Sequence, residues 1–218
     1  MKNRLAVVIA LICFNVAQLS AADSDTTGMR PFGGRFRFNG YSGGMLLHTG
    51  YVQSRTFTLH AADGAGVTRM RLRGAPLGIG GALRVRFGKH LRIGGEGCVS
   101  TLYGRHDSYQ TLGWGGVLAD CAWELERWTL FVGGTFGGGS VTNLVSLGSA
   151  LDDYTLEQDN LLYRKYSFLA LAPFFGAEYA VTDKVHLMIK SDYIVNLSNW
   201  QDDYVSGPRI YFGFMFCH

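Results

Sequence analysis

The sequence predicts an all-β fold in which eight antiparallel strands close into an up-and-down barrel. Eight stretches alternate apolar and polar residues with the period of two that is typical of strands. The connections between these stretches are alternately long and short, as expected when consecutive strands are antiparallel neighbours. An even number of antiparallel strands can close without an unpaired edge.

The eight stretches define the predicted elements in chain order. We predict strands at 35–51, 77–88, 91–105, 113–125, 128–144, 166–182, 185–196 and 208–216. Each is at least as long as the roughly 9–11 residues that cross a bilayer when a strand is tilted. Short turns are predicted at 89–90, 126–127 and 183–184, and long loops at 54–76, 106–112, 145–165 and 197–207.

The N-terminus has the pattern of an export signal. A basic start at 1–4 is followed by an apolar run at 5–16 and by the small residues Ser20, Ala21 and Ala22. We predict a signal peptide at 1–22, a flexible periplasmic arm at 23–34 and one barrel domain at 35–218. Removing Lys2 and Arg4 lowers the formal charge of +3 by two, to +1, which gives no indication of nucleic-acid binding.

The two faces of the predicted strands differ in a way that indicates a membrane. In the second strand Ile79, Leu83 and Val85 share one face, and Arg84 and Arg86 share the other. A soluble barrel of the lipocalin type has an apolar interior and a polar exterior, whereas here the charges fit the interior. The predicted polar network of the lumen comprises Arg84, Arg86, Arg92, Glu96, Asp120, Glu124, Glu178, Lys190 and Asp192.

The first strand needs one extra residue. Phe36 and Phe38 place the apolar face at even positions, whereas Tyr41, Leu47 and Tyr51 place it at odd positions. A β-bulge shifts the faces in this way. We predict the bulge at Gly40 or at Gly43-Gly44.

Aromatic residues collect at both ends of the apolar face. Tyr51, Tyr103 and Tyr193 lie toward the long loops, and Phe87, Trp128, Tyr179 and Phe216 lie toward the short turns. Two such girdles flank the apolar band of membrane barrels. Over residues 35–217 the chain resembles the small eight-stranded outer-membrane proteins of Gram-negative bacteria, the OmpX- and OmpA-domain-like group. That resemblance implies an assembly signal in the last strand, Pro208 to Phe216, although Cys217 and His218 extend past the usual terminal aromatic residue.

The interior charges predict a filled lumen. Strand parity places Glu178 opposite Lys190 and Glu96 diagonal to Arg84. An eight-stranded barrel is only wide enough for side chains, so a salt-bridge network is favoured over an ion or proton path. Parity also puts Cys98 inside and Cys121 outside, so we expect these thiols and Cys217 to be free.

Few residues suggest chemistry. His106, Asp107 and Ser108 have the types needed for an outer-leaflet lipid-modifying enzyme, but adjacent loop residues often point apart, and a solvated turn is the preferred interpretation. No spacing of ligands indicates a metal or another cofactor.

The long loops are therefore the favoured place for function. The first is basic, with Arg55, His60, Arg69, Arg71 and Arg73, and the third is acidic, with Asp152, Asp153, Glu157 and Asp159. Basic residues near the outer leaflet suit lipopolysaccharide phosphates. We predict a monomeric structural or surface-interaction protein of the cell outer membrane that contacts lipid, lipopolysaccharide, the barrel-assembly machinery and an extracellular ligand. The alternatives are a lipid-modifying enzyme and a narrow-conductance channel.

Overall fold

The computed structural model describes residues 38–218, except for 61–66, 105–107, 147–160 and 199. The predicted signal peptide, the periplasmic arm and the first three residues of the first strand lie outside this part of the chain. Among the described residues, no helix has the length and apolar character to span a bilayer.

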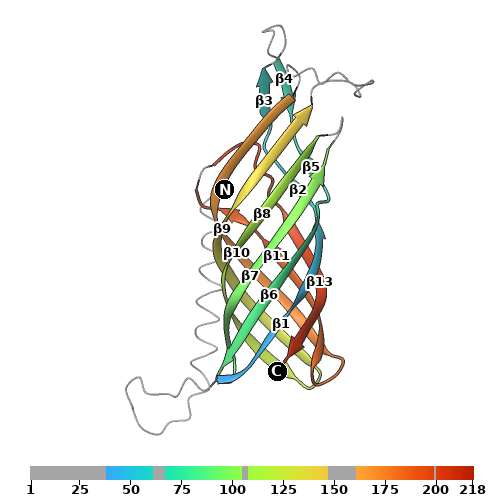
Figure 1. Ribbon diagram of the computed structural model, residues 1–218, viewed down its shortest axis with the longest axis vertical. Helices are drawn as coiled ribbons and strands as arrows, with labels where there is room; N and C mark the ends of the chain where they lie inside the picture. Colours follow the sequence, from blue (N-terminus) through green and yellow to red (C-terminus); the bar gives the residue numbers. More distant parts are fainter. Residues whose placement is uncertain (1–37, 61–66, 105–107, 147–160, 199) are drawn as a thin grey trace, which may run out of the picture. The chain divides into compact units, whose positions relative to one another are not determined.

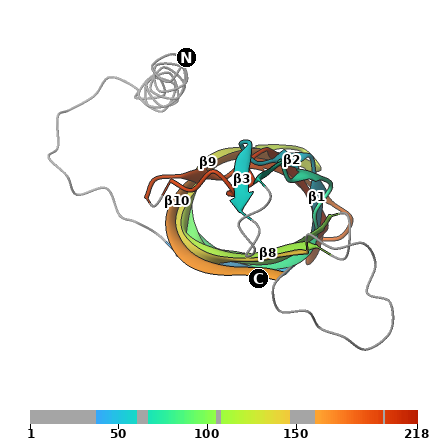
Figure 2. The ribbon, with the colours of Figure 1, turned by 90° about the horizontal axis from the view of Figure 1, so that it is seen from above.

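Eight long antiparallel strands wind round one axis and close into a ring, as predicted (Figures 1 and 2). The last strand pairs with the first strand on one side and with the seventh on the other, which leaves no open edge. The barrel strands are β1 (Phe38–Gly50), β6 (Leu77–Phe87), β7 (Leu91–Tyr103), β8 (Tyr109–Leu125), β9 (Trp128–Ser146), β10 (Leu161–Ala180), β11 (Val185–Tyr193) continued by β12 (Val195–Asn196), and β13 (Pro208–Cys217).

One end of the barrel, which we call the turn end, carries the three short connections, the beginning of β1 and the end of β13 (Figure 1). Gly88 and Glu126 adopt the left-handed backbone there, with φ of 64° and 55°. The predicted bulge also lies at this end. The register of β1 against β6 shifts between Phe38 and Tyr41, and Gly40 has φ of 115°, so the first of the two predicted positions is confirmed.

The opposite end, the loop end, is more ordered than the sequence indicated. The predicted first loop contains β2 (Val52–Gln53) paired with β5 (Arg73–Gly74), and a hairpin of β3 (Phe57–His60) and β4 (Val67–Met70). This hairpin stands above the ring (Figure 1). Its two strands alternate apolar and polar residues over only four positions each, Phe57–His60 and Val67–Met70, which is too short a run to stand out within a long loop.

The second predicted loop, at 106–112, is wrong in length. Tyr103 pairs directly with Tyr109, so only Gly104–Ser108 separate β7 from β8. Likewise β9 and β10 stay paired up to Ser146 and Leu161. In these extensions apolar and polar residues are mixed on both faces, so the period-two signal is lost there although the backbone pairing continues.

The two faces of the strands are as different in the structure as in the sequence. Outward apolar side chains are exposed to more than half of their area at Leu77, Val117 and Phe175. Inward charged side chains are almost completely buried, with Arg84 and Arg209 each at 1%. Such an inverted distribution is stable only when the surroundings are lipid, so the barrel spans a membrane.

Candidate functional site

The lower half of the lumen, toward the turn end, is filled by a four-residue ion-pair layer. Glu178 Oε1 accepts hydrogen bonds from Arg84 Nη1 at 2.7 Å and from Arg92 Nη1 at 2.8 Å. Asp120 lies 2.6 Å from Arg92 Nε and 3.4 Å from Arg84 Nε. The ring of Phe131 packs against both guanidinium groups, 4.7 and 5.0 Å from its centroid. Each buried charge therefore has opposite charges in contact, which offsets its desolvation.

A second layer lies above the first. Lys190 Nζ donates to Glu96 Oε2 at 2.7 Å and lies 3.5 Å from Asp192. Thr135 donates to the other oxygen of Glu96 at 2.6 Å. The ring centroid of Tyr211 lies 4.3 Å from Lys190 Nζ, and the same ring stacks with the imidazole of His48. The layer therefore also consists of side chains from strands that are far apart in sequence.

The interior charges cancel. The buried cations are Arg84, Arg92, Lys190 and Arg209, and the buried carboxylates beneath the loop end are Glu96, Asp120, Glu178 and Asp192. Arg209 faces Asp192 directly across β13 and β11, and Arg92 faces Asp120 across β7 and β8. Pores that select ions with charged side chains carry rings of one sign, whereas this set is balanced and most of its members contact one another.

The loop end of the lumen is closed by the connection between β12 and β13. Asp203 accepts a hydrogen bond from Asn143 Nδ2 at 2.5 Å through its carboxylate, and from Gln110 Nε2 at 3.0 Å through its backbone carbonyl. Its other carboxylate oxygen lies 3.5 Å from Arg164. Tyr204 packs edge-on against Phe168, and burial raises the pKa of its phenol above the ordinary value. We call Asp203, Asn143, Gln110 and Tyr204 the cap.

The base of the first loop has a small apolar core of its own. Val52, Leu72, Leu102 and Val205 are buried together, with Phe57 packed against them. Arg71 donates to the carbonyl of Ser54 at 3.1 Å and to Gln53 Oε1 at 2.8 Å. The basic loop is therefore held by packing and by hydrogen bonds at its base.

Most of the charges predicted in the lumen lie in these two layers. The register confirms that Glu96 is diagonal to Arg84, whereas the predicted pairing of Glu178 with Lys190 is wrong. Glu178 pairs in register with Met188, two residues from Lys190. The connection from β10 to β11 spans four residues, 181–184, instead of two, and this shifts the register. Arg86 and Glu124 contact each other at the turn end, where the Glu124 side chain is 58% exposed, so they are not part of the buried network.

The other predicted positions can be placed as follows. Tyr51, Tyr103, Tyr193, Phe87, Trp128, Tyr179 and Phe216 all lie on the outer face. Of the enzyme candidates, His106 and Asp107 lie outside the described residues, and Ser108 is buried with its carbonyl accepting from Gly104 N at 2.7 Å. Cys98, Cys121 and Cys217 are free, as predicted. The described residues contain no cluster of three potential metal ligands.

Sequence reasoning did not identify the cap. Asp203 and Tyr204 lie within the predicted loop at 197–207 and have no alternation around them. Gln110 lay in a segment predicted as loop. The available signal was the pair of Asp and Tyr side chains a few residues before the last strand, in a loop that must return to the barrel wall.

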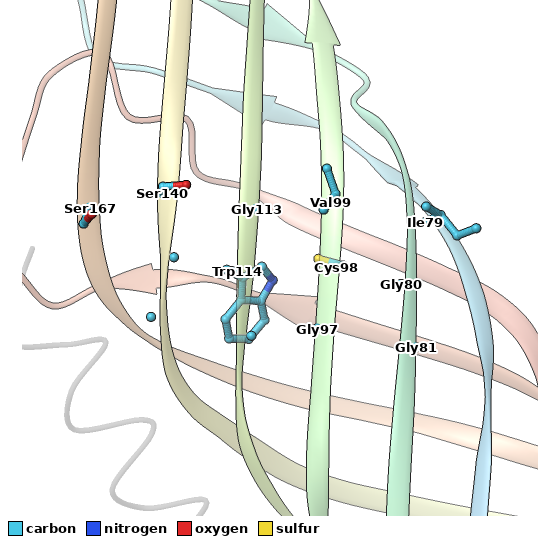
Figure 3. A pocket seen from close by; sticks show the side chains of 13 residues that line it. Ile79, Gly80, Gly81, Gly97, Cys98, Val99, Gly113, Trp114, Ser140 and Ser167 are labelled. Carbon is cyan, nitrogen blue, oxygen red and sulfur yellow. The ribbon is translucent and has the colours of Figure 1, made fainter.

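The barrel wall also carries a hollow of about 750 Å³ on its outer face. Figure 3 shows the strands that line it side by side, from Ser167 and Ser140 on one side, through Gly113 and Gly97, to Gly80 and Gly81 on the other. The directly paired outward residues Gly81, Gly97, Gly115 and Gly138 form its floor.

Comparisons with known proteins agree with the fold. No family model matches the chain, and no curated protein matches it. Among solved structures it is similar to Ail of Yersinia pestis in complex with the heparin analogue sucrose octasulfate, at 16% identity and a TM-score of 0.46 over 82% of this chain and 99% of that chain. It is also similar to Neisserial surface protein A, at 14% identity and a TM-score of 0.47 over 82% and 95%.

A third similar structure is the outer-membrane protein OprG of Pseudomonas aeruginosa, at 11% identity and a TM-score of 0.43 over 81% of this chain and 96% of that chain. At these identities the likenesses concern the fold alone. The stronger argument comes from the molecule itself, because a closed even-stranded barrel with an apolar outer band and aromatic girdles is the architecture of bacterial outer membranes. The chain is an eight-stranded antiparallel β-barrel with the lipid-facing outer band of a membrane-spanning barrel.

Proposed function

We propose that this protein is a non-enzymatic surface protein that binds its ligand at the loop end of the barrel, outside the cell. The observation that carries the proposal is the contrast between a closed lumen and a structured basic loop. The two ion-pair layers and the cap fill the middle and the loop end of the lumen, and the hollow that remains, of about 430 Å³, lies at the turn end beside Arg86 and Glu124. The first loop, by contrast, exposes the side chains of Arg55, Arg69, Arg71 and Arg73. Its base is held by the apolar cluster of Val52, Leu72, Leu102 and Val205.

The chemistry of the loop favours an anionic ligand. Four guanidinium groups present donors in forks that match phosphate, sulfate or carboxylate groups. Among the described residues, the only acidic side chain in contact with them is Asp202, 3.7 Å from Arg55 and itself exposed. Lipopolysaccharide phosphates and acidic polysaccharides both fit this pattern. The acidic residues of the third predicted loop, 145–165, fall within 147–160, which lies outside the described residues, and this loop stays a second predicted contact region.

The test is binding of folded barrel to a sulfated sugar and to lipopolysaccharide. Ail was solved with sucrose octasulfate, which makes this compound a convenient probe. We expect the triple variant Arg55→Gln, Arg69→Gln, Arg73→Gln, which leaves the hydrogen bonds of Arg71 at the loop base in place, to lose most of the affinity, since each cation near an anionic surface contributes about 1 kcal/mol. The matched control neutralises three exposed cations of the turn end: Lys89→Gln, Arg127→Gln, Lys184→Gln.

Equal affinity of the triple variant and its control would contradict the proposal. Deleting residues 147–160 tests the third loop separately. Both variants should keep the shift in gel mobility between heated and unheated samples, which reports a folded barrel.

Export and assembly are part of the same proposal. We propose cleavage after Ala22, so the intact mass of the purified protein should correspond to a chain that begins at Asp23. The last strand, β13, is the proposed signal for the assembly machinery, and Phe216→Ala should lower the amount of folded protein in the membrane. No change in that amount would contradict this part of the proposal.

A narrow channel is the second candidate, and the structure disfavours it. Balanced interior charges and a hydrogen-bonded cap oppose ion entry from either end. Conductance in a planar bilayer decides this point.

A further inference from the structure

The connection between β12 and β13 contacts both the lumen and the first loop. Asp203 lies in the cap, whereas the neighbouring Asp202 is exposed and its carboxylate lies 3.7 Å from Nη1 of Arg55. Three residues after Asp203, Ser206 pairs with Gln53 through two reciprocal backbone hydrogen bonds of 3.0 Å. The chain that follows Asp202 is therefore fixed at two points, which keeps the Asp202 carboxylate next to the first loop.

The arginines of the first loop share one exposed face. Ser54 N donates to the carbonyl of Leu72 at 2.7 Å, so these two buried residues face each other across the loop. Side chains alternate between the two faces of paired strands, and the flanking residues Arg55, Arg71 and Arg73 are all exposed. Like charges that face each other across paired strands repel. This face therefore favours an anion.

Asp202 supplies one anion to this face, but it is held there weakly. The distance of 3.7 Å to Arg55 is longer than the about 2.7–2.9 Å of a charge-assisted hydrogen bond. The two side chains are 63% and 61% exposed, and exposed pairs contribute little to stability. A sulfate or phosphate group can contact a guanidinium group in a bidentate manner at shorter distance, so such a group can take the place of the carboxylate.

From these contacts we propose that Asp202 is a built-in competitor of the anionic ligand. In the free protein its carboxylate neutralises Arg55, and in the complex a sulfate or phosphate group of the ligand replaces it. Because the carboxylate is attached to the barrel, its effective concentration at Arg55 is high. Asp202 thereby lowers the affinity of the site. The inference rests on the proposed function and names a residue that regulates the same site.

A purely structural role of the contact predicts the opposite effect. If the pair of Arg55 and Asp202 kept the loop in its binding conformation, removing the carboxylate would weaken ligand binding. The base of the loop does not depend on this pair, however, because Val205 is buried with Val52 and Leu72 in the apolar cluster. The direction of the change in affinity therefore separates the two roles.

The test is titration of the full-length folded barrel with sucrose octasulfate in detergent micelles, at low ionic strength, where exposed charges are least screened. We expect Asp202→Asn to bind this compound about threefold more tightly than the wild type does, which is the size of effect expected for an exposed ion pair. Asp183→Asn is the matched control, because Asp183 is an exposed carboxylate at the turn end. The control should bind as the wild type does.

The Arg55→Gln background separates direct competition from a general charge effect. In that background the carboxylate has no cation to occupy, so Asp202→Asn should add no measurable affinity. The same threefold gain with and without Arg55 would overturn the proposal, because it would show that Asp202 only repels the ligand at a distance.

Lipopolysaccharide is titrated in parallel to identify the displacing group. A gain confined to sucrose octasulfate assigns the contact to sulfate groups, and a gain confined to lipopolysaccharide assigns it to phosphate groups. Equal or weaker binding of both ligands by Asp202→Asn would overturn the role of Asp202 alone, provided that the wild type binds through its arginines. The proposed function fails separately, if the wild type and the triple arginine variant bind both ligands equally.

Discussion

The two halves of the lumen are closed by different kinds of interaction. In the half near the turn end, charged side chains from β6, β7, β8 and β10 meet one another, and Glu178 is shared by two arginines. In the half near the loop end, a connecting segment folds back over the opening and is held chiefly by amide and carboxylate hydrogen bonds around Asp203. The ion-pair layers are formed by side chains of the barrel strands themselves, whereas the cap is a connecting segment that is attached to the strands.

This difference has consequences for stability. A buried ion pair that loses one partner leaves an unpaired charge in the interior, whereas a lost cap contact can be replaced by water at the mouth. Changes in the lower layers should therefore unfold the whole barrel, and changes in the cap should open only its end.

The largest effect is expected for Glu178→Gln. This substitution leaves Arg84 and Arg92 buried with only Asp120 as an anionic partner, and we expect a loss of about 3–5 kcal/mol in the free energy of unfolding. Urea unfolding of the barrel in detergent micelles measures it. The control is Glu124→Gln at the exposed pair with Arg86, for which about 1 kcal/mol or less is expected. Equal losses in the two variants would show that the buried layer is no more important than a surface pair.

A smaller and local effect is expected for Asp203→Ala. It removes the acceptor for Asn143 and the partner of Arg164, at a cost of about 1–3 kcal/mol. Amide hydrogen exchange should quicken at 200–207 while the barrel strands keep their protection. Asp202→Ala, one residue away and exposed, serves as the control. Faster exchange throughout β8 and β9 would contradict a separately attached cap.

The smallest effect is expected from chemical labelling of the cysteines. Cys98 faces the lumen and Cys121 faces lipid, so labelling reports on both faces of the wall without a substitution. A membrane-permeant maleimide should label Cys121, which faces lipid, and should leave Cys98 unlabelled in the folded barrel, because Cys98 is buried in the lumen next to Tyr211. Mass spectrometry of the peptides gives the extent of labelling at each of the two cysteines. Labelling of Cys98 at the rate of Cys121 would mean that the lumen is open to the reagent.

The half of the lumen near the turn end could be predicted, because its charged residues lie in strands with clear two-residue alternation. The half near the loop end could not, because the cap residues have no such alternation around them. Alternation placed Arg84, Arg92 and Lys190 inside because each belongs to a strand with one face in lipid. It could not give their partners, since a change of two residues in the register at the 181–184 turn moves Glu178 from Lys190 to Met188. The cap depends on contacts between Asp203 and residues about 60 and 93 positions away, and no local pattern reports such contacts.

The extended loop end shows the same limit. Beyond the apolar band, β8, β9 and β10 continue as paired backbone with apolar and polar residues mixed on both sides, so the strand signal ended several residues before the strands did. The wall hollow was visible only as an excess of glycine. Its shape required the registers that bring Gly81, Gly97, Gly115 and Gly138 into one row.

The central claim is that the lumen is filled and that function lies on the outside. Single-channel recording in a planar bilayer tests it most directly, with wild-type protein and Asp203→Ala compared at the same ionic strength. The account predicts no conductance steps from either protein, since the two ion-pair layers remain when the cap is lost. Stable conductance steps from the wild type would contradict the claim.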